Sequence, residues 1–138
     1  MKSFQNFIEE VKIESVLKLS LNGSVLATAL KLQKKIKDSD SIPLKEKDLH
    51  ITLASGPEWK KEKSKIQLPI PEPDFRIDLE EPIEKISQGN RTSWYVKVKQ
   101  QREIKKYIKN ILGIIPNPDR IYHVSLANLT GKTGDSIA

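Results

Sequence analysis

The sequence contains no cysteine and only two histidines. Without thiol groups the chain cannot form a disulfide framework, a cysteine nucleophile or a zinc–sulfur site. Two histidines do not favour a histidine-rich metal site, so the sequence predicts no metal and no cofactor. No apolar run approaches the roughly 20 residues that a membrane-spanning helix requires. Walker-type, dinucleotide-binding and kinase signatures are missing as well, which excludes the commonest nucleotide-binding motifs.

Charge is the clearest compositional feature of the sequence. Lys and Arg number 24 against 18 acidic residues, so the net charge is +6 and the isoelectric point lies near 9.4. This excess favours an anionic partner such as a nucleotide, and an ordinary solvated basic surface explains it equally well. Residues 1–14 contain no signal-peptide core, so we expect a cytoplasmic protein without membrane contact. Nothing in the sequence implies a protein partner.

The 138 residues predict one domain in which strands and helices alternate. Alternation of apolar residues predicts strands over 16–21, 48–54, 94–99 and 120–127, and a bent extended segment over 75–86. Helical spacing predicts amphipathic helices over 1–14, 25–37 and 101–112. The lysine- and proline-rich residues 57–74 show no period and predict a long surface loop.

The two halves of the sequence, roughly residues 15–56 and 75–127, repeat the same order of elements. Each half runs strand, helix, loop and strand. The last strand is His50-Ile51-Thr52-Leu53-Ala54 in the first half and His123-Val124-Ser125-Leu126-Ala127 in the second. Both histidines of the chain therefore occupy the same relative place, and the repeat predicts two pseudo-symmetric β-α-β halves whose histidines converge across a groove.

The two H-x-[ST] strands carry a set of groups that suits phosphodiester cleavage. Residues two apart in a strand point to the same face, so His50 lies with Thr52 and His123 with Ser125. Imidazole has an unperturbed pKa of about 6.5, so one histidine can accept a proton from the attacking hydroxyl while the other protonates the leaving oxygen. The two hydroxyls can donate to the phosphate oxygens, and no metal is required. A single histidine on an apolar strand is usually structural, but two on matched strands favour catalysis.

Strand alternation and sequence position suggest six further residues near the substrate. Lys18 and Ser20 in the first strand, and Tyr95 and Lys97 in the third, are expected to face the cleft. Simple solvation of an exposed sheet face accounts for the two lysines equally well. Trp59 either stacks on a base or packs its loop onto the body of the protein. Asn128 follows the second motif and is expected at the mouth of the cleft.

The paired motifs His50-Ile51-Thr52-Leu53 and His123-Val124-Ser125-Leu126 resemble the two-histidine (2H) phosphoesterase superfamily over about residues 15–127. The small size and the segment YHVSLANLTG, residues 122–131, are similar to the phage anti-CBASS nucleases, which degrade cyclic di- and trinucleotide signals of bacterial immunity. The resemblance implies a bilobed α+β fold whose antiparallel sheets face a central cleft. It also implies metal-independent hydrolysis of 3′–5′ bonds, in the host cytoplasm if a phage encodes the protein. Ser125 departs from the threonine that many members carry.

Two alternative functions remain open at the level of the sequence. One is an RNA-processing phosphodiesterase that acts on 2′,3′-cyclic phosphates or 2′–5′ linkages, as other members of the superfamily do. The other is a module that sequesters a nucleotide without turnover. The presence of both histidines argues against sequestration, because binding alone does not need a matched acid and base.

Overall fold

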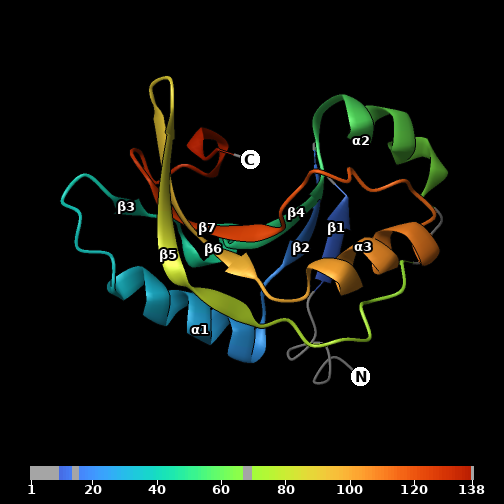
Figure 1. Cartoon of the computed structure of the whole chain (residues 1–138), viewed down its shortest axis with the longest axis horizontal. Helices are drawn as coiled ribbons and strands as arrows, with labels where there is room; N and C mark the ends of the chain where they lie inside the picture. The colour runs from blue at the N-terminus through green and yellow to red at the C-terminus, as the bar shows by residue number, and fades with distance from the viewer. Residues whose placement is uncertain (1–9, 14–15, 67–69, 138) are drawn as a thin grey trace.

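One antiparallel sheet runs through the described part of the chain, which in this computed structural model comprises residues 10–13, 16–66 and 70–137 (Figure 1). Its strands follow the order β1, β2, β4, β7, β6, β5, and each neighbouring pair is antiparallel. The bounds are β1 Glu10–Ile13, β2 Leu17–Ser20, β4 His50–Ala54, β5 Leu79–Gln88, β6 Arg91–Val98 and β7 His123–Asn128. A short β3, Ile42–Pro43, pairs with the end of β7. The strands of both sequence halves are thus joined through the contact between β4 and β7.

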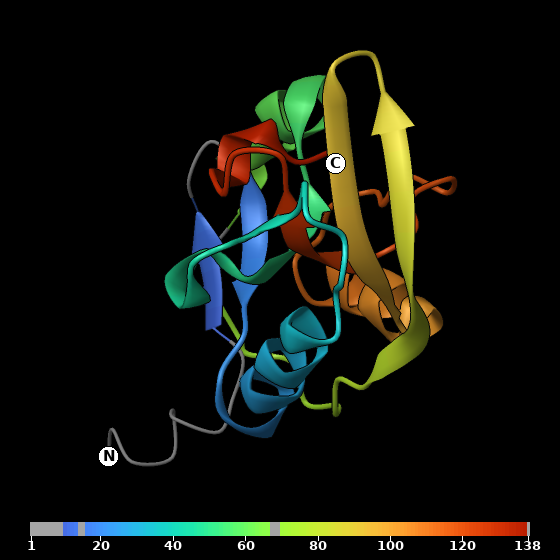
Figure 2. The same ribbon diagram turned by 90° about the vertical axis from the view of Figure 1, so that its left-hand side faces the viewer.

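Two helices lie on one side of the central strands, and the opposite side is left more open (Figures 1 and 2). The helices on the covered side are α1, Gly23–Lys34, and α3, Gln101–Asn110. On the other side, α2, Gly56–Glu62, the tip of the β5–β6 hairpin and the 3₁₀ turn Thr133–Asp135 rise around the strands. Two further 3₁₀ turns span Glu46–Asp48 and Lys63–Lys65.

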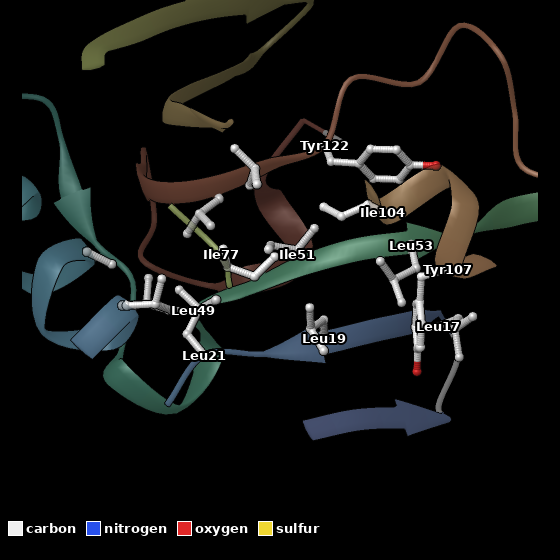
Figure 3. Close-up of a cluster of buried hydrophobic side chains, with 14 of the residues drawn as sticks. Leu17, Leu19, Leu21, Leu49, Ile51, Leu53, Ile77, Ile104, Tyr107 and Tyr122 are labelled. Atoms are coloured by element: carbon white, nitrogen blue, oxygen red, sulfur yellow. The ribbon is translucent and has the colours of Figure 1, made fainter. Parts of the chain in front are cut away.

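The alternation of apolar residues in the strands produces the core (Figure 3). Eight large aliphatic side chains of the four central strands are at most 2% exposed: Leu17, Leu19, Ile51, Leu53, Val96, Val98, Val124 and Leu126. Ala29 and Leu32 of α1 and Ile104 and Ile108 of α3 complete the same cluster. Each large aliphatic side chain so buried contributes about 1.5–3 kcal/mol of transfer free energy. This packing commits one face of the sheet to the core and leaves the polar residues on the other.

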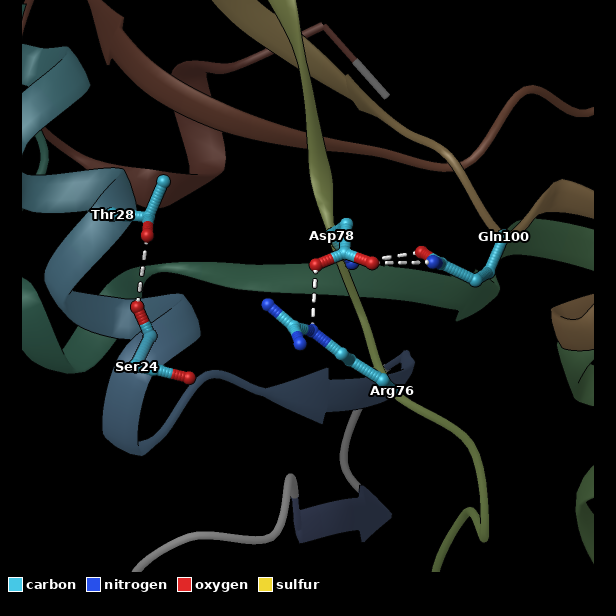
Figure 4. Close-up of polar contacts among 5 residues, drawn as sticks. All are labelled: Ser24, Thr28, Arg76, Asp78 and Gln100. Atoms are coloured by element: carbon cyan, nitrogen blue, oxygen red, sulfur yellow. Dashed lines mark hydrogen bonds and ion pairs between the residues drawn. The ribbon is translucent and has the colours of Figure 1, made fainter.

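Side-chain hydrogen bonds tie the start of β5 to the start of α3 (Figure 4). The Gln100 amide accepts from the backbone N–H of Asp78 at 2.8 Å and donates to its carboxylate at 2.9 Å. The second carboxylate oxygen of Asp78 accepts from Arg76 Nε at 2.9 Å. Figure 4 also shows Thr28 Oγ1 donating to the carbonyl of Ser24 within α1. The hydrogen bonds of Asp78 fix the point where the chain enters the hairpin that forms one wall of the open face.

The expected α+β class is confirmed, together with the helices predicted over 25–37 and 101–112. The strands predicted over 16–21, 48–54, 94–99 and 120–127 are present, with ends that differ by a few residues. The prediction that Leu17 and Leu19 face the core while Lys18 and Ser20 do not is also confirmed by their burial.

The surface loop predicted over 57–74 is wrong at its start, because α2 occupies Gly56–Glu62. Pro57 fits the first turn of a helix, where its missing N–H would have no intrahelical partner. A helix of this length is not stable by itself in water. Trp59 is 1% exposed and belongs to the core cluster, so tertiary packing supplies the stability that no sequence period revealed.

The helix predicted over 1–14 is wrong for Glu10–Ile13, which form β1 and pair with β2. Residues 1–9 and 14 lie outside the described residues. Apolar residues in so short a window fit both a helical and an alternating pattern. The edge of β2 offers unpaired backbone N–H and C=O groups, and pairing with them favours the strand.

Candidate active site

The two H-x-[ST] motifs lie on adjacent strands at the centre of the sheet. Ile51 of β4 pairs with Val124 of β7. Because the pairing is antiparallel, extending the register by one residue in each direction brings His50 beside Ser125 and Thr52 beside His123. Ile51 and Val124 are fully buried, whereas the motif residues on either side of them are partly exposed. Both imidazoles and both hydroxyls therefore share the face that α1 and α3 do not cover.

The neighbouring strands extend this polar face on both sides. Ser20 and Lys18 of β2 pair with His50 and Thr52, respectively. Tyr95 and Lys97 of β6 pair with Ser125 and His123. We call the resulting two rows the polar grid: Ser20–His50–Ser125–Tyr95 and Lys18–Thr52–His123–Lys97. The structure thus brings together eight of the ten residues that the sequence predicted to lie at the site.

Each histidine is held by a backbone carbonyl two residues earlier in the chain. His50 Nδ1 lies 2.8 Å from the Asp48 oxygen, and His123 Nδ1 lies 2.9 Å from the Ile121 oxygen. A carbonyl only accepts, so Nδ1 carries the proton in both rings and Nε2 is the reactive nitrogen. The Nε2 atom of His50 lies 3.2 Å from Thr52 Oγ1, whose hydroxyl can donate to it.

The two imidazoles have different surroundings. Burial lowers the pKa of His50 below its ordinary value of 6.5, and the positive charges of Lys18 and His123 act in the same direction. The hydrogen bond to the Asp48 carbonyl opposes this shift. His123 contacts the ring of Tyr95 edge-on, with 5.2 Å between the ring centroids. Burial therefore biases His50 toward the neutral form at physiological pH.

Two adjoining pockets open over the polar grid. The first encloses about 330 Å³ and is lined by Lys18, His50, Thr52, His123 and Ser125, together with Arg91 and residues of the segment 133–137. The second, of about 450 Å³, extends from His123 past Tyr95 and Lys97 to Arg120. His123 and Ile137 line both pockets. A ligand bound at His123 consequently has space on both sides.

The electrostatic character of the two pockets differs. Among the described residues, no acidic side chain lines the first pocket, where Lys18 and Arg91 join the two histidines. The second pocket contains Asp119 as well as Lys97 and Arg120. Lys97 Nζ lies 3.4 Å from the Glu84 carboxylate, and Arg120 donates to Ser55 Oγ at 2.9 Å. The first pocket is the better site for an anion, because its described lining residues include two cationic side chains and no carboxylate.

Two nominated residues occupy places that correct the expectation. Trp59 is 1% exposed in the core, so its ring has no face available for a base and it packs α2 instead. Asn128 is fully buried. Its amide donates to Lys132 O and Ser136 Oγ and accepts from the N–H groups of Thr130 and Gly131. Its role is to hold the following segment, because no part of its side chain is left exposed to a substrate.

Sequence reasoning missed the residues that reach the site from its walls. Arg91 lies at the start of β6, and Thr133, Gly134 and Ser136 lie beyond the last strand. None belongs to a motif with catalytic spacing. The clustering of Gly, Thr and Ser in residues 130–136 was the one available signal, and it indicates a turn as readily as a ligand site.

Within the described residues, no three His, Cys, Asp or Glu side chains are grouped to hold a metal ion. None of the helices in that part of the chain has the length and apolar character needed to cross a membrane. Comparison with protein-family models, with curated proteins and with solved structures gave no match.

Proposed function

We propose that this chain is a phosphodiesterase of the two-histidine type, with His50 as general base and His123 as general acid. The observation that carries the proposal is the register of β4 and β7, which puts both histidines and both hydroxyls on one face and into one pocket. A local pseudo-twofold axis through the Ile51–Val124 pair exchanges His50 with His123 and Thr52 with Ser125. We propose that this axis relates the two lobes of a 2H-type fold.

The environment of His50 supports its role as base. Its pKa is lowered by burial, so its Nε2 holds a free electron pair at neutral pH. The nitrogen accepts the proton of an attacking hydroxyl, either water or a ribose 2′-hydroxyl, while the new P–O bond forms. Base catalysis of this kind contributes about 100- to 10,000-fold in rate.

His123, diagonally opposite His50 in the grid, completes the reaction. Its protonated Nε2 donates to the leaving oxygen as the original P–O bond breaks, so the products are a phosphate ester and an alcohol. Thr52 and Ser125 donate to the non-bridging oxygens, on which charge grows in the transition state. Lys18, paired with Thr52, adds a positive charge beside the same oxygens.

We propose cyclic di- and trinucleotides with 3′–5′ linkages as the substrates, as in the anti-CBASS nucleases that counter host immunity. The two pockets that meet at His123 favour a phosphodiester with a nucleoside on each side. Cleavage of RNA 2′,3′-cyclic phosphates or 2′–5′ linkages is the alternative, and the same acid and base serve it. Substrate shape distinguishes the two.

The proposal is tested by incubating the protein with cyclic dinucleotides, cyclic trinucleotides, 2′–5′ dinucleotides and RNA 2′,3′-cyclic phosphates, with and without EDTA. We expect turnover of the cyclic oligonucleotides that survives EDTA. Loss of turnover with EDTA and its recovery with a divalent metal would contradict the mechanism. Preference for the RNA substrates would establish the alternative.

Variants of three of the four motif residues separate catalysis from sequestration. His50→Ala and His123→Ala should each lower kcat by at least about 100-fold while nucleotide binding persists. Ser125→Ala should lower kcat by up to about 1000-fold. Ser24→Ala is the matched control, because Ser24 is exposed on α1 at the covered side of the sheet. Tight binding without turnover by the wild type would show that the protein sequesters its ligand.

A further inference from the structure

The polar face continues past the grid along β6 and β7. Ser93 pairs with Asn128 directly across the two strands, and both side chains are fully buried. They are the two fully buried polar residues among those the structure describes. The segment 129–137 lies over them, held by the Asn128 amide and by a 2.7 Å hydrogen bond from the Ile137 N–H to Ser93 Oγ. A buried polar pair therefore anchors this segment as a wall of the first pocket.

The anchored wall presents hydrogen-bond donors to the pocket. Thr133 and Ser136 both line it. Ser136 Oγ accepts from Asn128 Nδ2 at 3.0 Å, so the position of its oxygen is fixed and its proton can be donated to a ligand. Asn128 thereby positions Ser136 without reaching the pocket itself.

Arg91 borders the same space from the β5–β6 hairpin. It is the first residue of β6, exposed at the tip of the β5–β6 hairpin, and it also lines the first pocket. Positions 91, 93, 95 and 97 alternate onto the open face, so the guanidinium belongs to the face that carries the grid. Its planar fork is suited to two oxygens of a phosphate.

These donors are separate from those that the cleavage reaction uses. The grid already provides an acid, a base and two hydroxyls for the phosphate that is cleaved. Arg91, Thr133 and Ser136 offer a guanidinium and two hydroxyls, and no acidic residue among the described lining residues competes for them. A group that only accepts hydrogen bonds and carries negative charge satisfies all three.

We propose that Arg91, Ser136 and Thr133 form a second anion subsite that binds the phosphate of the substrate that is not being cleaved. The identity of the ligand rests on the proposed function, because a cyclic dinucleotide carries two phosphodiesters and a dinucleoside monophosphate carries one. The subsite selects substrates by the number of their phosphates. Asn128 and Ser93 are its positioning residues.

The test compares two probes, a 3′–5′ cyclic dinucleotide and the dinucleoside monophosphate with the same bases. Binding is measured by calorimetry and turnover by chromatography, for the wild type, Arg91→Ala, Arg91→Lys and Ser136→Ala. Arg102→Ala is the matched control: Arg102 is equally exposed, but it lies on α3 across the sheet. It removes the same charge without touching the pocket.

We expect Arg91→Ala to weaken binding of the cyclic dinucleotide and raise its KM by roughly tenfold to a hundredfold, with kcat nearly unchanged. Arg91→Lys should recover part of the loss, and Ser136→Ala should show a smaller loss of the same kind. Binding of the dinucleoside monophosphate should be the same in all variants. Arg102→Ala should match the wild type with both probes.

The outcomes separate the subsite from the proposed function. If the wild type binds the cyclic dinucleotide through Arg91 but does not cleave it, the subsite stands and the phosphodiesterase activity does not. If the wild type cleaves the cyclic dinucleotide and Arg91→Ala has the same affinity and KM for it as the wild type, the activity stands and the subsite is overturned. Equal losses with both probes, or with Arg102→Ala, indicate general electrostatic attraction and overturn it too, as does an absence of binding by the wild type.

Discussion

At the scale of single residues, His50 and His123 have the same sequence context but different environments. Each Nδ1 donates to a carbonyl two residues earlier, which leaves Nε2 as the reactive atom in both rings. Burial and the neighbouring charge of Lys18 act on His50. Burial lowers the pKa of His50, and the proposed assignment of His50 as the base rests on this direction.

The titration of His50 can be measured directly by NMR, because the chain has only two histidines. We expect its midpoint below 6.5, since burial favours the neutral ring. Removing the positive charge in Lys18→Met should raise the midpoint toward 6.5. Lys97→Met is the control: Lys97 lies in the same row of the grid but is not among the charges that shift His50. A wild-type midpoint at or above 6.5, or equal shifts in both variants, would contradict this account.

The same shift sets the acidic limb of the activity profile. As the pH falls through the pKa of His50, the ring gains a proton and can no longer act as base, so kcat/KM should fall. Because that pKa is lowered, activity should persist somewhat below pH 6.5 and decline only at more acidic pH. The profile of Lys18→Met should decline at higher pH than that of the wild type.

At the scale of elements, two short segments close the open face, and neither is stable by its own sequence. α2 depends on the burial of Trp59, and the segment 129–137 depends on the buried amide of Asn128. Trp59 was expected either to stack on a base or to pack its loop onto the protein, and Asn128 was expected at the mouth of the cleft, because each follows an H-x-[ST] motif in the chain. In the structure both side chains point into the protein. The two segments that they hold in place, α2 and residues 129–137, face the site.

Replacing Asn128 should loosen the segment 129–137 before it affects the rest of the fold. Asn128→Ala removes five hydrogen bonds, and leaving buried polar partners unsatisfied costs about 1–3 kcal/mol. Amide hydrogen exchange at Ile137, which donates to Ser93 Oγ, should accelerate by at least about tenfold. Asn110→Ala, at an exposed position ending α3, serves as the control. Equal acceleration at Ile51 and Val124 would instead indicate global destabilisation.

At the scale of the whole molecule, the two halves share one sheet and one core. β4 and β7 are neighbours, and the core cluster contains residues from both halves. Neither half can bury its apolar face without the other. The face that carries the polar grid is consequently assembled only when β4 and β7 have paired.

This arrangement predicts a single cooperative unfolding transition. The chain has two tryptophans, Trp59 in α2 directly after the first half and Trp94 in the second half, and both are buried. After labelling with 5-fluorotryptophan, their native ¹⁹F resonances should disappear at the same urea concentration. Two midpoints separated by more than the experimental error would show that the halves unfold independently.

The sequence by itself determined the elements of the site, because alternation in a strand decides which side chains share a face. His50 with Thr52, His123 with Ser125, and Lys18 with Ser20 could all be assigned from this local rule. Tertiary structure decided the contacts between residues far apart in the chain, which the alternation of side chains in a strand does not determine. The register between β4 and β7 pairs residues 73 positions apart (Ile51 and Val124), and it sets the diagonal placement of the two histidines. Likewise Arg91 and Ser136 enter the pocket only because the β5–β6 hairpin and the segment 129–137 fold over the sheet. Trp59 and Asn128 are buried by tertiary packing as well.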